Sequence, residues 1–240
     1  MLGKIYDSML AVVYPQACQI CENSVENSSD GIACRDCWEK TRIFSGAEAL
    51  CHKCGAFLRE AASDFANFCH ACDEHSYDSA RAVGIYEDAL SASVLNLKNE
   101  PFVSQRLRRL FINAFENSDF HDAGVIIPVP LSRKRLLERG FNQAAVLAGI
   151  LAAHTKILTD EKSLVRTVHS PMHRAAMDRK ARESTVRNAF EVKRPKLIEG
   201  ENVLLIDDVF TSGATVSNCA KALKKKGANK VYVLTLARAV

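Results

Sequence analysis

Residues 203–215, Val-Leu-Leu-Ile-Asp-Asp-Val-Phe-Thr-Ser-Gly-Ala-Thr, form the stretch that decides the fold of this chain. Its four leading apolar residues predict a short strand that is buried on both faces. Two carboxylates, Asp207 and Asp208, follow where this strand leaves the core. A loop of small residues, Thr211–Thr215, then opens a helix that we expect over Ala214–Lys226. The order of strand, acidic pair, small loop and helix is typical of a ligand site in an α/β protein.

The loop Thr211–Thr215 has the chemistry of an anion site. The first backbone N–H groups of a helix are unpaired and carry a partial positive charge. Gly213 lets the backbone come close to an oxyanion, and the neighbouring hydroxyl groups add donors. Asp207 and Asp208 would repel a phosphate, so we expect them to accept hydrogen bonds from ribose hydroxyls or to bind Mg²⁺. The alternative, an ordinary helix cap, suits a lone Thr-Ser-Gly but not the whole arrangement.

Strands and helices alternate on both sides of this stretch, which predicts a parallel sheet covered on both faces. The expected strands are Ala80–Tyr86, Val125–Pro130, Val203–Ile206 and Lys230–Leu236. The expected helices are Val103–Phe115, Gly140–His154 and Ala214–Lys226. Ligands of such sheets bind beyond the carboxyl ends of the strands.

Basic residues follow the strand that ends near Pro130. Arg133, Lys134 and Arg135 could grip a polyanion, because arginine binds phosphate oxygens through two hydrogen bonds. The alternative is a solvated basic turn. Asn142 and Gln143 begin the next predicted helix, and they are either polar groups of the site or simple helix-start residues.

Eight of the nine cysteines lie in the first third of the chain as four Cys-x-x-Cys pairs. The pairs are Cys18 and Cys21, Cys34 and Cys37, Cys51 and Cys54, and Cys69 and Cys72. The two-residue gap lets a tight turn aim both sulfurs at one metal ion, and two turns complete a tetrahedral shell. Because the segment has few large apolar residues, it needs a metal to fold. We therefore predict structural zinc.

Three other chemistries compete with zinc as explanations of the paired cysteines. Disulfides need an oxidising compartment, and a redox motif would be a single pair beside a strand–helix–strand unit. An iron–sulfur cluster uses the same thiolates and is the more serious rival. We expect consecutive pairs to share an ion, although the spacing also permits crossed pairing. The ninth cysteine, Cys219, lies in a predicted helix and is expected to be a small buried side chain.

The composition is that of an ordinary soluble globular protein, with 25% charged and 48% hydrophobic residues. The net charge of +4 would be cancelled by eight thiolates binding two zinc ions, so it gives little support for a nucleic-acid partner. No apolar run is long enough to span a membrane. Residues 1–14 predict a short amphipathic helix rather than a signal peptide, since Asp7 interrupts them. We expect a cytoplasmic protein without membrane insertion.

The stretch 203–215 resembles the motif with which type I phosphoribosyltransferases bind phosphoribosyl pyrophosphate (PRPP). The resemblance extends over nearly the whole chain. The cysteine pairs, Ile127-Pro-Val-Pro-Leu131, Arg139-Gly-Phe-Asn-Gln143 and the PRPP motif, in this order, are similar to the ComF/GntX family. Members of that family are linked to DNA uptake in natural transformation. The resemblance implies an α/β type I phosphoribosyltransferase fold over residues 77–240, behind a double zinc-ribbon module with an N-terminal helix over residues 1–76.

The resemblance also implies roles for individual residues. The PRPP-binding residues would be Asp207, Asp208, Val209, Thr211, Ser212, Gly213, Ala214 and Thr215. The two aspartates would hold the ribose as the catalytic pair, with magnesium nearby, and Thr211–Thr215 would surround the 5′-phosphate. Arg133, Lys134 and Arg135 would hold the pyrophosphate. The polar segment His169–Arg187 resembles the family's flexible hood over the site, and a plain surface loop is the alternative.

Three functions are compatible with these features. The first is a transferase with zinc and magnesium that moves a phosphoribosyl group to an acceptor. The second is a non-catalytic PRPP-sensing protein that binds single-stranded DNA and meets DNA-uptake or helicase proteins. The third, a zinc-ribbon nucleic-acid binder with a vestigial sheet domain, is disfavoured by the intact PRPP motif.

Overall fold

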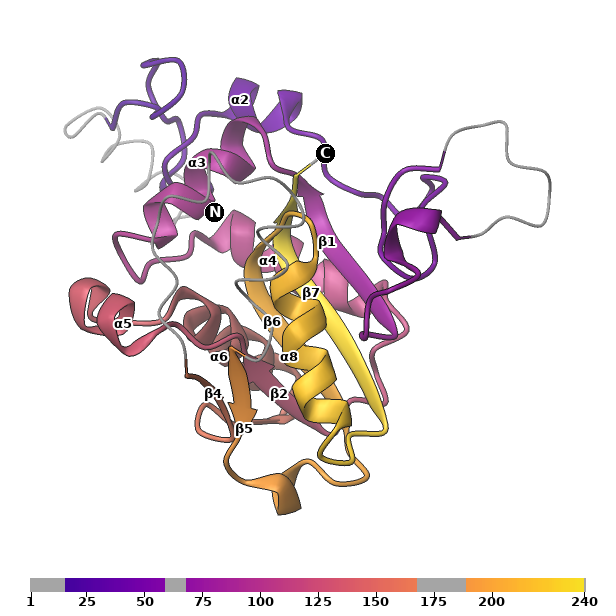
Figure 1. The fold of residues 1–240 in the computed structure, drawn as a ribbon. Coiled ribbons are helices and arrows are strands. Elements are labelled where there is room, and N and C mark those ends of the chain that lie inside the picture. The colour runs from indigo at the N-terminus through magenta and orange to yellow at the C-terminus, as the bar shows by residue number, and fades with distance from the viewer. Residues whose placement is uncertain (1–15, 59–67, 168–188, 240) are drawn as a thin grey trace, which may run out of the picture.

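A computed structural model describes residues 16–58, 68–167 and 189–239 of the chain (Figure 1). The helix predicted over residues 1–14 and the segment His169–Arg187 lie outside the described residues. The described part forms a five-stranded sheet with helices on both faces, preceded by two cysteine-bearing segments. None of the helices in these ranges is both long and apolar enough to cross a lipid bilayer.

The five strands of the sheet are all parallel and follow the order β1-β7-β6-β2-β3. They are β1 (Ser79–Ile85), β2 (Val125–Pro128), β3 (Leu158–Thr159), β6 (Asn202–Phe210) and β7 (Lys230–Arg238). All four residues of β2 are buried, as expected for a strand covered on both faces. A separate antiparallel pair consists of β4 (Leu164–Arg166) and β5 (Phe190–Val192).

Helices divide between the two faces of the sheet. One face, here called the α6 face, carries α3 (Asp88–Leu97), α4 (Gln105–Glu116) and α6 (Gln143–Thr155). The other, the α8 face, carries α8 (Ala214–Lys224) and the β4–β5 pair. Strand side chains alternate between them, so Leu204 and Ile206 join the core of the α6 face, and Val203 and Leu205 that of the α8 face.

Strand β6 is longer than the sequence indicated. We expected it to end at Ile206, with both aspartates beyond it, whereas it pairs with β7 as far as Phe210. The neighbouring strand β7 runs on to Arg238, so the backbone of β6 keeps its hydrogen-bond partners through the acidic pair. Asp207 and Asp208 therefore point to opposite faces of the sheet.

The segment after β2 also differs from the prediction. We expected a basic loop and then one helix over Gly140–His154. Instead, α5 (Arg133–Arg139) begins at Ser132, whose hydroxyl accepts a hydrogen bond from the N–H of Arg135. Helix α6 starts only after Asn142, because the left-handed backbone of Gly140 ends α5 first. The basic cluster thus lies in the first turn of a helix. Helix α3 was not predicted.

Two cysteine modules precede the sheet and pack on opposite faces of it. The first module, residues 16–44, contains η1 (Ser28–Asp30) and α2 (Arg35–Lys40). The second module, residues 45–58 and 68–76, contains η2 (His70–Cys72). Buried cysteines of the first module belong to the core of the α6 face, and those of the second belong to the core of the α8 face. In Figure 1 the second module stands to the right of β1.

Strand β1 is an edge of the sheet, and both modules lie along its outer side. Backbone hydrogen bonds join residues 42–44 to residues 83–85, and the N–H of Ala80 donates to the carbonyl of Lys53 at 2.7 Å. Gly84 permits this close approach, since a Cβ atom there would overlap the backbone of the first module. The N-terminal modules thus extend the hydrogen bonding of the sheet beyond its last strand.

Candidate functional site

A cleft of about 630 Å³ opens at the carboxyl ends of β2 and β6. Helix α6 covers one face of the sheet and helix α8 covers the other, so the cleft lies at the point where α/β proteins bind ligands. Its volume is within the usual range for small-molecule sites. The described residues that line it are Lys98, Asn99, Val129, Pro130, Leu131, Arg135, Glu138, Arg139, Gln143, Arg166, Asp207, Asp208, Val209, Thr211 and Thr215.

Asp208 points to the α6 face and is only 7% exposed. Its Oδ2 atom lies 3.6 Å from Nζ of Lys98 and accepts a hydrogen bond from Nε2 of Gln143 at 3.3 Å. Arg139 in turn donates to Oε1 of Gln143. One carboxylate of the acidic pair is therefore held by a cation and an amide that come from two different helices.

Asp207 points to the α8 face, and its surroundings are less favourable to charge. Burial and the negative charge of Asp208 raise the pKa of the Asp207 carboxyl well above its usual value, and Lys98 offsets this only in part. Its Oδ1 atom accepts the backbone N–H of Asp208 at 2.9 Å. A carboxyl group kept where ionisation is costly is typical of a functional site.

The loop 211–215 connects β6 to α8 at the edge of the cleft. Gly213 is the residue before α8, with a left-handed backbone at φ 75°, and it provides no side-chain cap. The hydroxyl of Ser212 lies 3.4 Å from the N–H of Ala214. Thr211 and Thr215 line the cleft. Apart from this contact with Ser212, no described side chain caps the start of α8, so most of its first N–H groups have no side-chain partner.

The predicted polyanion cluster is only partly in the cleft. Arg135 lines it, whereas Lys134 forms an exposed ion pair with Glu138 at 3.8 Å, and Arg133 is not among the described lining residues. The cluster begins a helix, so successive side chains point in different directions.

Three cationic side chains outside the predicted cluster also line the cleft. They are Lys98, at the end of α3, Arg139, at the end of α5, and Arg166, in β4. Arg139 belongs to a motif that the sequence singled out, but no spacing rule connects Lys98 or Arg166 to the cleft. They reach it only through the packing of distant elements.

The sequence left two roles open for Asn142 and Gln143, a helix-start residue or a polar group of the site. The structure gives the first role to Asn142 and the second to Gln143. The side chain of Asn142 accepts a hydrogen bond from the N–H of Ala144 at 3.1 Å and donates one to the carbonyl of Val129 at 3.1 Å, so it caps α6 and joins it to the residue after β2. Gln143 lines the cleft and contacts Asp208. The first is a helix-start residue and the second is a site group.

The eight paired cysteines form two groups. The sulfur atoms of Cys18, Cys21, Cys34 and Cys37 all lie within 4.8 Å of one another, as do those of Cys51, Cys54, Cys69 and Cys72. Consecutive pairs therefore come together. Cys219 is separate from both groups and fully buried in α8, as expected.

Comparison with known proteins identifies the sheet domain. Residues 93–239 match the phosphoribosyl transferase domain family. The chain belongs to that family. Residues 9–76 match the double zinc ribbon domain. The expected phosphoribosyltransferase fold with an N-terminal zinc ribbon is thereby confirmed.

Relatives of this phosphoribosyl transferase family member align over most of the chain. Competence protein F of Haemophilus influenzae is 29% identical over 231 residues, covering 92% of this chain and 96% of that protein. The DNA utilization protein YhgH of Escherichia coli K12 is 28% identical, covering 93% and 97%. Competence protein ComFC of Bacillus subtilis is 27% identical, covering 84% and 89%. The resemblance to the ComF/GntX proteins is confirmed.

The cysteine groups of this family member fit zinc. Neighbouring sulfurs are 3.4–3.7 Å apart, as between Cys54 and Cys69 or Cys18 and Cys37. A tetrahedral shell with zinc–sulfur bonds of about 2.3 Å has edges of about 3.8 Å. The ribbon therefore offers two closed thiolate shells without a large rearrangement.

The first cysteine of each group is prepared for ionisation. Burial raises the pKa of Cys18, but hydrogen bonds from backbone N–H groups, first that of Cys21, lower it to about 6. Burial also raises the pKa of Cys51, and backbone hydrogen bonds lower it to about 7. One of these donors, the N–H of Cys69, lies 3.2 Å from the Cys51 sulfur. Since metals bind thiolates, these backbone turns favour metal binding.

Proposed function

We propose that the cleft binds PRPP together with Mg²⁺. The observation that carries this proposal is the position of the acidic pair, between the open start of α8 on one side and the cations of α5 on the other. A phosphoribosyl ligand has the matching order of groups, with a 5′-phosphate, two ribose hydroxyls and a pyrophosphate. The family to which the chain belongs supports the same ligand class.

Each part of the cleft has a role in this proposal. Thr211, Thr215 and the N-terminus of α8 would hold the 5′-phosphate. Asp207 and Asp208 would accept hydrogen bonds from the ribose hydroxyls and could both serve as oxygen ligands of magnesium. The metal would neutralise charge on the leaving pyrophosphate. Arg135 would hold pyrophosphate oxygens.

The chemistry that fits these roles is transfer of the phosphoribosyl group. The bond between the anomeric carbon and a pyrophosphate oxygen breaks, and a bond to a nucleophile of the acceptor forms while the acceptor loses a proton. The transition state has oxocarbenium character, as in glycoside cleavage. The residues of the cleft would orient the sugar and exclude water around the reacting carbon.

Calorimetric titration tests this proposal directly. We expect the protein to bind PRPP with magnesium present and at least tenfold more weakly without it. Asp208→Asn should remove most of the binding. This carboxylate is buried at the cleft and contacts both Lys98 and Gln143. If the wild-type protein shows no heat of PRPP binding in either condition, the cleft is not a PRPP site.

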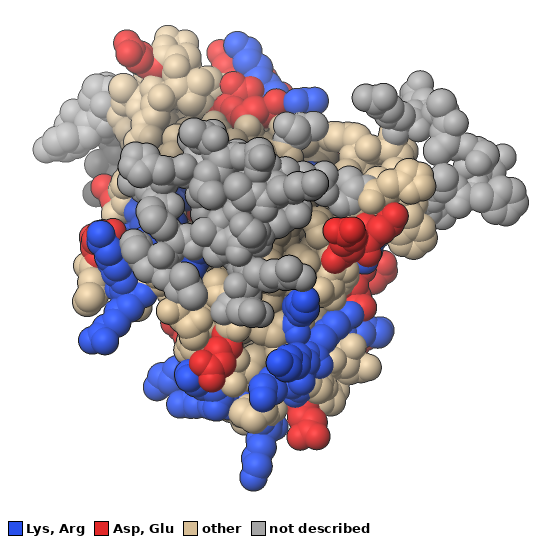
Figure 2. Space-filling model, viewed as in Figure 1, with Lys and Arg blue, Asp and Glu red and all other residues tan. Residues whose placement is uncertain are grey.

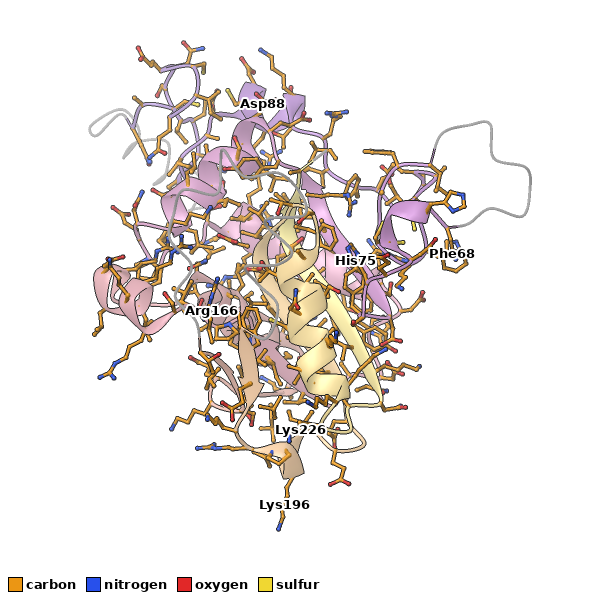
Figure 3. All side chains as sticks on the ribbon, viewed as in Figure 1. Phe68, His75, Asp88, Arg166, Lys196 and Lys226 are labelled. Carbon is orange, nitrogen blue, oxygen red and sulfur yellow. The ribbon has the colours of Figure 1, made fainter. Side chains whose placement is uncertain are left out.

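A second function, binding of single-stranded DNA, is favoured by a basic surface away from the cleft. Lysine and arginine side chains gather on the lower part of the face in Figure 2. Figure 3 labels two of the lysines there, Lys226, just after α8, and Lys196, in η4 (Pro195–Leu197). This surface lies near the amino end of β7, so DNA there would not compete with PRPP. The relatives named as competence and DNA utilization proteins support it.

The test of this second function is a charge reversal. Lys225→Glu with Lys226→Glu should weaken single-stranded DNA binding and reduce its salt dependence, since fewer phosphates are neutralised. PRPP binding should not change. Equal DNA affinity in the variant and the wild type at low salt would exclude this surface.

We also propose that residues 1–76 and 77–240 are the two domains of the chain. The change of composition after Tyr77 supports the division, but the contacts between the second cysteine module and the phosphate-binding end of the sheet join the two parts closely.

A further inference from the structure

The loop 211–215 has the cleft on one side and the second cysteine module on the other. His75, three residues after the last cysteine of that module, lies against Gly213. A Cβ atom added to Gly213 would be 2.8 Å from Cε1 of His75 and 2.7 Å from Cζ of Phe210. Figure 3 shows His75 beside the upper end of α8, where the loop enters the helix. The loop is therefore enclosed from behind by aromatic rings.

His75 is held in place by its own contacts. Its Nδ1 atom and the hydroxyl of Tyr77 form a hydrogen bond of 2.6 Å. Tyr77 is buried and meets the ring of Phe210 edge-on, with centroids 6.0 Å apart. The three rings form a continuous wall behind the loop. Two of them, His75 and Tyr77, lie in residues 73–78, here called the linker, which joins Cys72 to β1.

Backbone contacts fix this wall to both the cysteine module and α8. The N–H of His75 donates to the carbonyl of Cys72 at 3.1 Å. The N–H of Ser76 donates to the hydroxyl of Ser217, in the first turns of α8, at 3.0 Å. The linker is thus hydrogen-bonded to Cys72, a predicted zinc ligand, and to α8, the helix that starts at the loop.

A second connection runs through Arg238, at the end of β7. Its guanidinium lies 4.6 Å from the centre of the Phe210 ring and donates to the carbonyl of Cys54. Phe210 is the last residue of β6 and comes directly before the loop. Both ends of the wall are therefore connected to cysteines of the second group.

We propose that His75 is a positioning residue for the loop that binds the 5′-phosphate, and that it transmits the fold of the second cysteine module to that loop. This inference rests on the proposed function of the cleft. The imidazole fills the space behind Gly213 and prevents the loop from moving back from the ligand. The phosphate-binding N–H groups then stay in place without a ligand, which reduces the ordering cost of binding.

The inference predicts a selective effect on one end of the ligand. The 5′-phosphate contacts the loop, whereas pyrophosphate contacts the opposite side of the cleft. His75→Ala should therefore weaken the binding of ribose 5-phosphate roughly tenfold and leave pyrophosphate binding within about twofold. His75→Gln, which keeps a planar polar group of similar reach, should restore much of the affinity.

The experiment is calorimetry with ribose 5-phosphate and with magnesium pyrophosphate on five full-length proteins. They are the wild type, His75→Ala, His75→Gln, Tyr77→Phe and the control His70→Ala. His70 belongs to the same module, but its side chain is exposed, and the ion pair with Asp73 at 3.7 Å is its contact. His70→Ala should bind both ligands like the wild type. Tyr77→Phe removes the hydrogen bond but keeps the ring, and it should lie between the wild type and His75→Ala.

Each outcome decides one point. Equal affinity of the wild type and His75→Ala for ribose 5-phosphate would overturn the role of His75 and leave the proposed function intact. An equal loss for both ligands would overturn it as well, because general loosening of the fold would explain that result. A wild-type protein that binds neither ligand would remove the proposed function and the inference together.

Discussion

The two cysteine modules are alike in ligands and spacing but unlike in what they support. The first module packs on helices of the α6 face. The hydroxyl of Thr41 donates to the carbonyl of Cys37 at 2.8 Å and accepts the N–H of Ala89 at 3.0 Å. The guanidinium of Arg106 lies 4.9 Å from the centre of the Trp38 ring. These contacts hold the module to α3 and α4, away from the loop 211–215.

The second module packs where the sheet ends and the loop begins. Its contacts reach Phe210, Ser217 and Arg238, all next to the proposed phosphate site. The same four-cysteine arrangement thus packs on a helical layer on one face and lies behind the proposed ligand site on the other. The two modules have the same cysteine pattern, so the difference between them comes from the elements on which each one packs.

Loss of one thiolate from each module gives the largest expected effect. Cys51→Ser and Cys34→Ser should each release one zinc ion per chain and destabilise the protein by several kcal/mol, because metal binding supplies folding free energy. Only Cys51→Ser should also weaken ribose 5-phosphate binding. Elemental analysis, thermal unfolding and calorimetry measure the three quantities. A full zinc content in Cys51→Ser would mean that this residue is not a ligand.

A smaller loss of stability is expected from Gly213→Ala. The added methyl group would contact only Phe210 and His75, on the side of the second module. The left-handed backbone and the close rings of His75 and Phe210 should cost about 1–3 kcal/mol of stability. Ribose 5-phosphate affinity should fall with it, since the added methyl group pushes the loop toward the ligand. Gly46 also has positive φ, but no atom lies near its Cβ position, so Gly46→Ala is the matched control. Equal losses in both variants would show that backbone strain alone explains the result.

Thr41→Val tests the first module by itself. It removes a buried hydroxyl that connects Cys37 to the start of α3, so the free energy of unfolding should fall by about 1–2 kcal/mol. Ligand binding in the cleft should not change. A loss of ribose 5-phosphate affinity would contradict the separation of the two faces.

The smallest expected change in stability comes from the acidic pair. Its two members point to opposite faces of the sheet, so their substitution should affect Tm differently. The folded protein holds the proton of Asp207 at pH values where the unfolded chain has released it. The stability contribution of Asp207 is therefore complete below the ordinary carboxyl pKa of about 4 and is lost as pH rises through the raised folded pKa. Asp207→Asn should raise Tm by a few degrees at pH 7 and by less at pH 4.

Asp208→Asn is the matched variant for this test. It leaves Lys98 without its carboxylate partner, so we expect no gain of Tm at pH 7. Both variants should lose PRPP binding. Thermal unfolding at several pH values measures the difference, and a stabilisation by Asp208→Asn equal to that by Asp207→Asn would contradict the distinct environments of the pair.

Local patterns predicted the parts of the fold that depend on local chemistry. The apolar runs gave the strands around Ile127 and Leu205, and the cysteine spacing gave the metal groups. Helix α5 could have been found as well. Ser132 is a favourable first cap, Gly140 is a usual helix end, and the stretch between them has good helix formers.

The remaining features depend on contacts between distant segments. Strand β6 continues past Ile206 because β7 lies beside it, which no pattern within β6 can show. Lys98 reaches Asp208 from the end of α3, and Arg166 enters the cleft from β4. The face on which each cysteine module packs, and hence the place of His75, is likewise fixed by tertiary packing.

The hydrogen bonds between the modules and β1 have a consequence for solubility. An open edge strand can recruit a strand from another molecule, and natural proteins cover such edges. Here residues 42–44 and Lys53 occupy the outer side of β1, while the other edge, β3, is only two residues long. Metal depletion would uncover the long edge, so chelation should lead to intermolecular β-pairing and precipitation before the sheet itself unfolds.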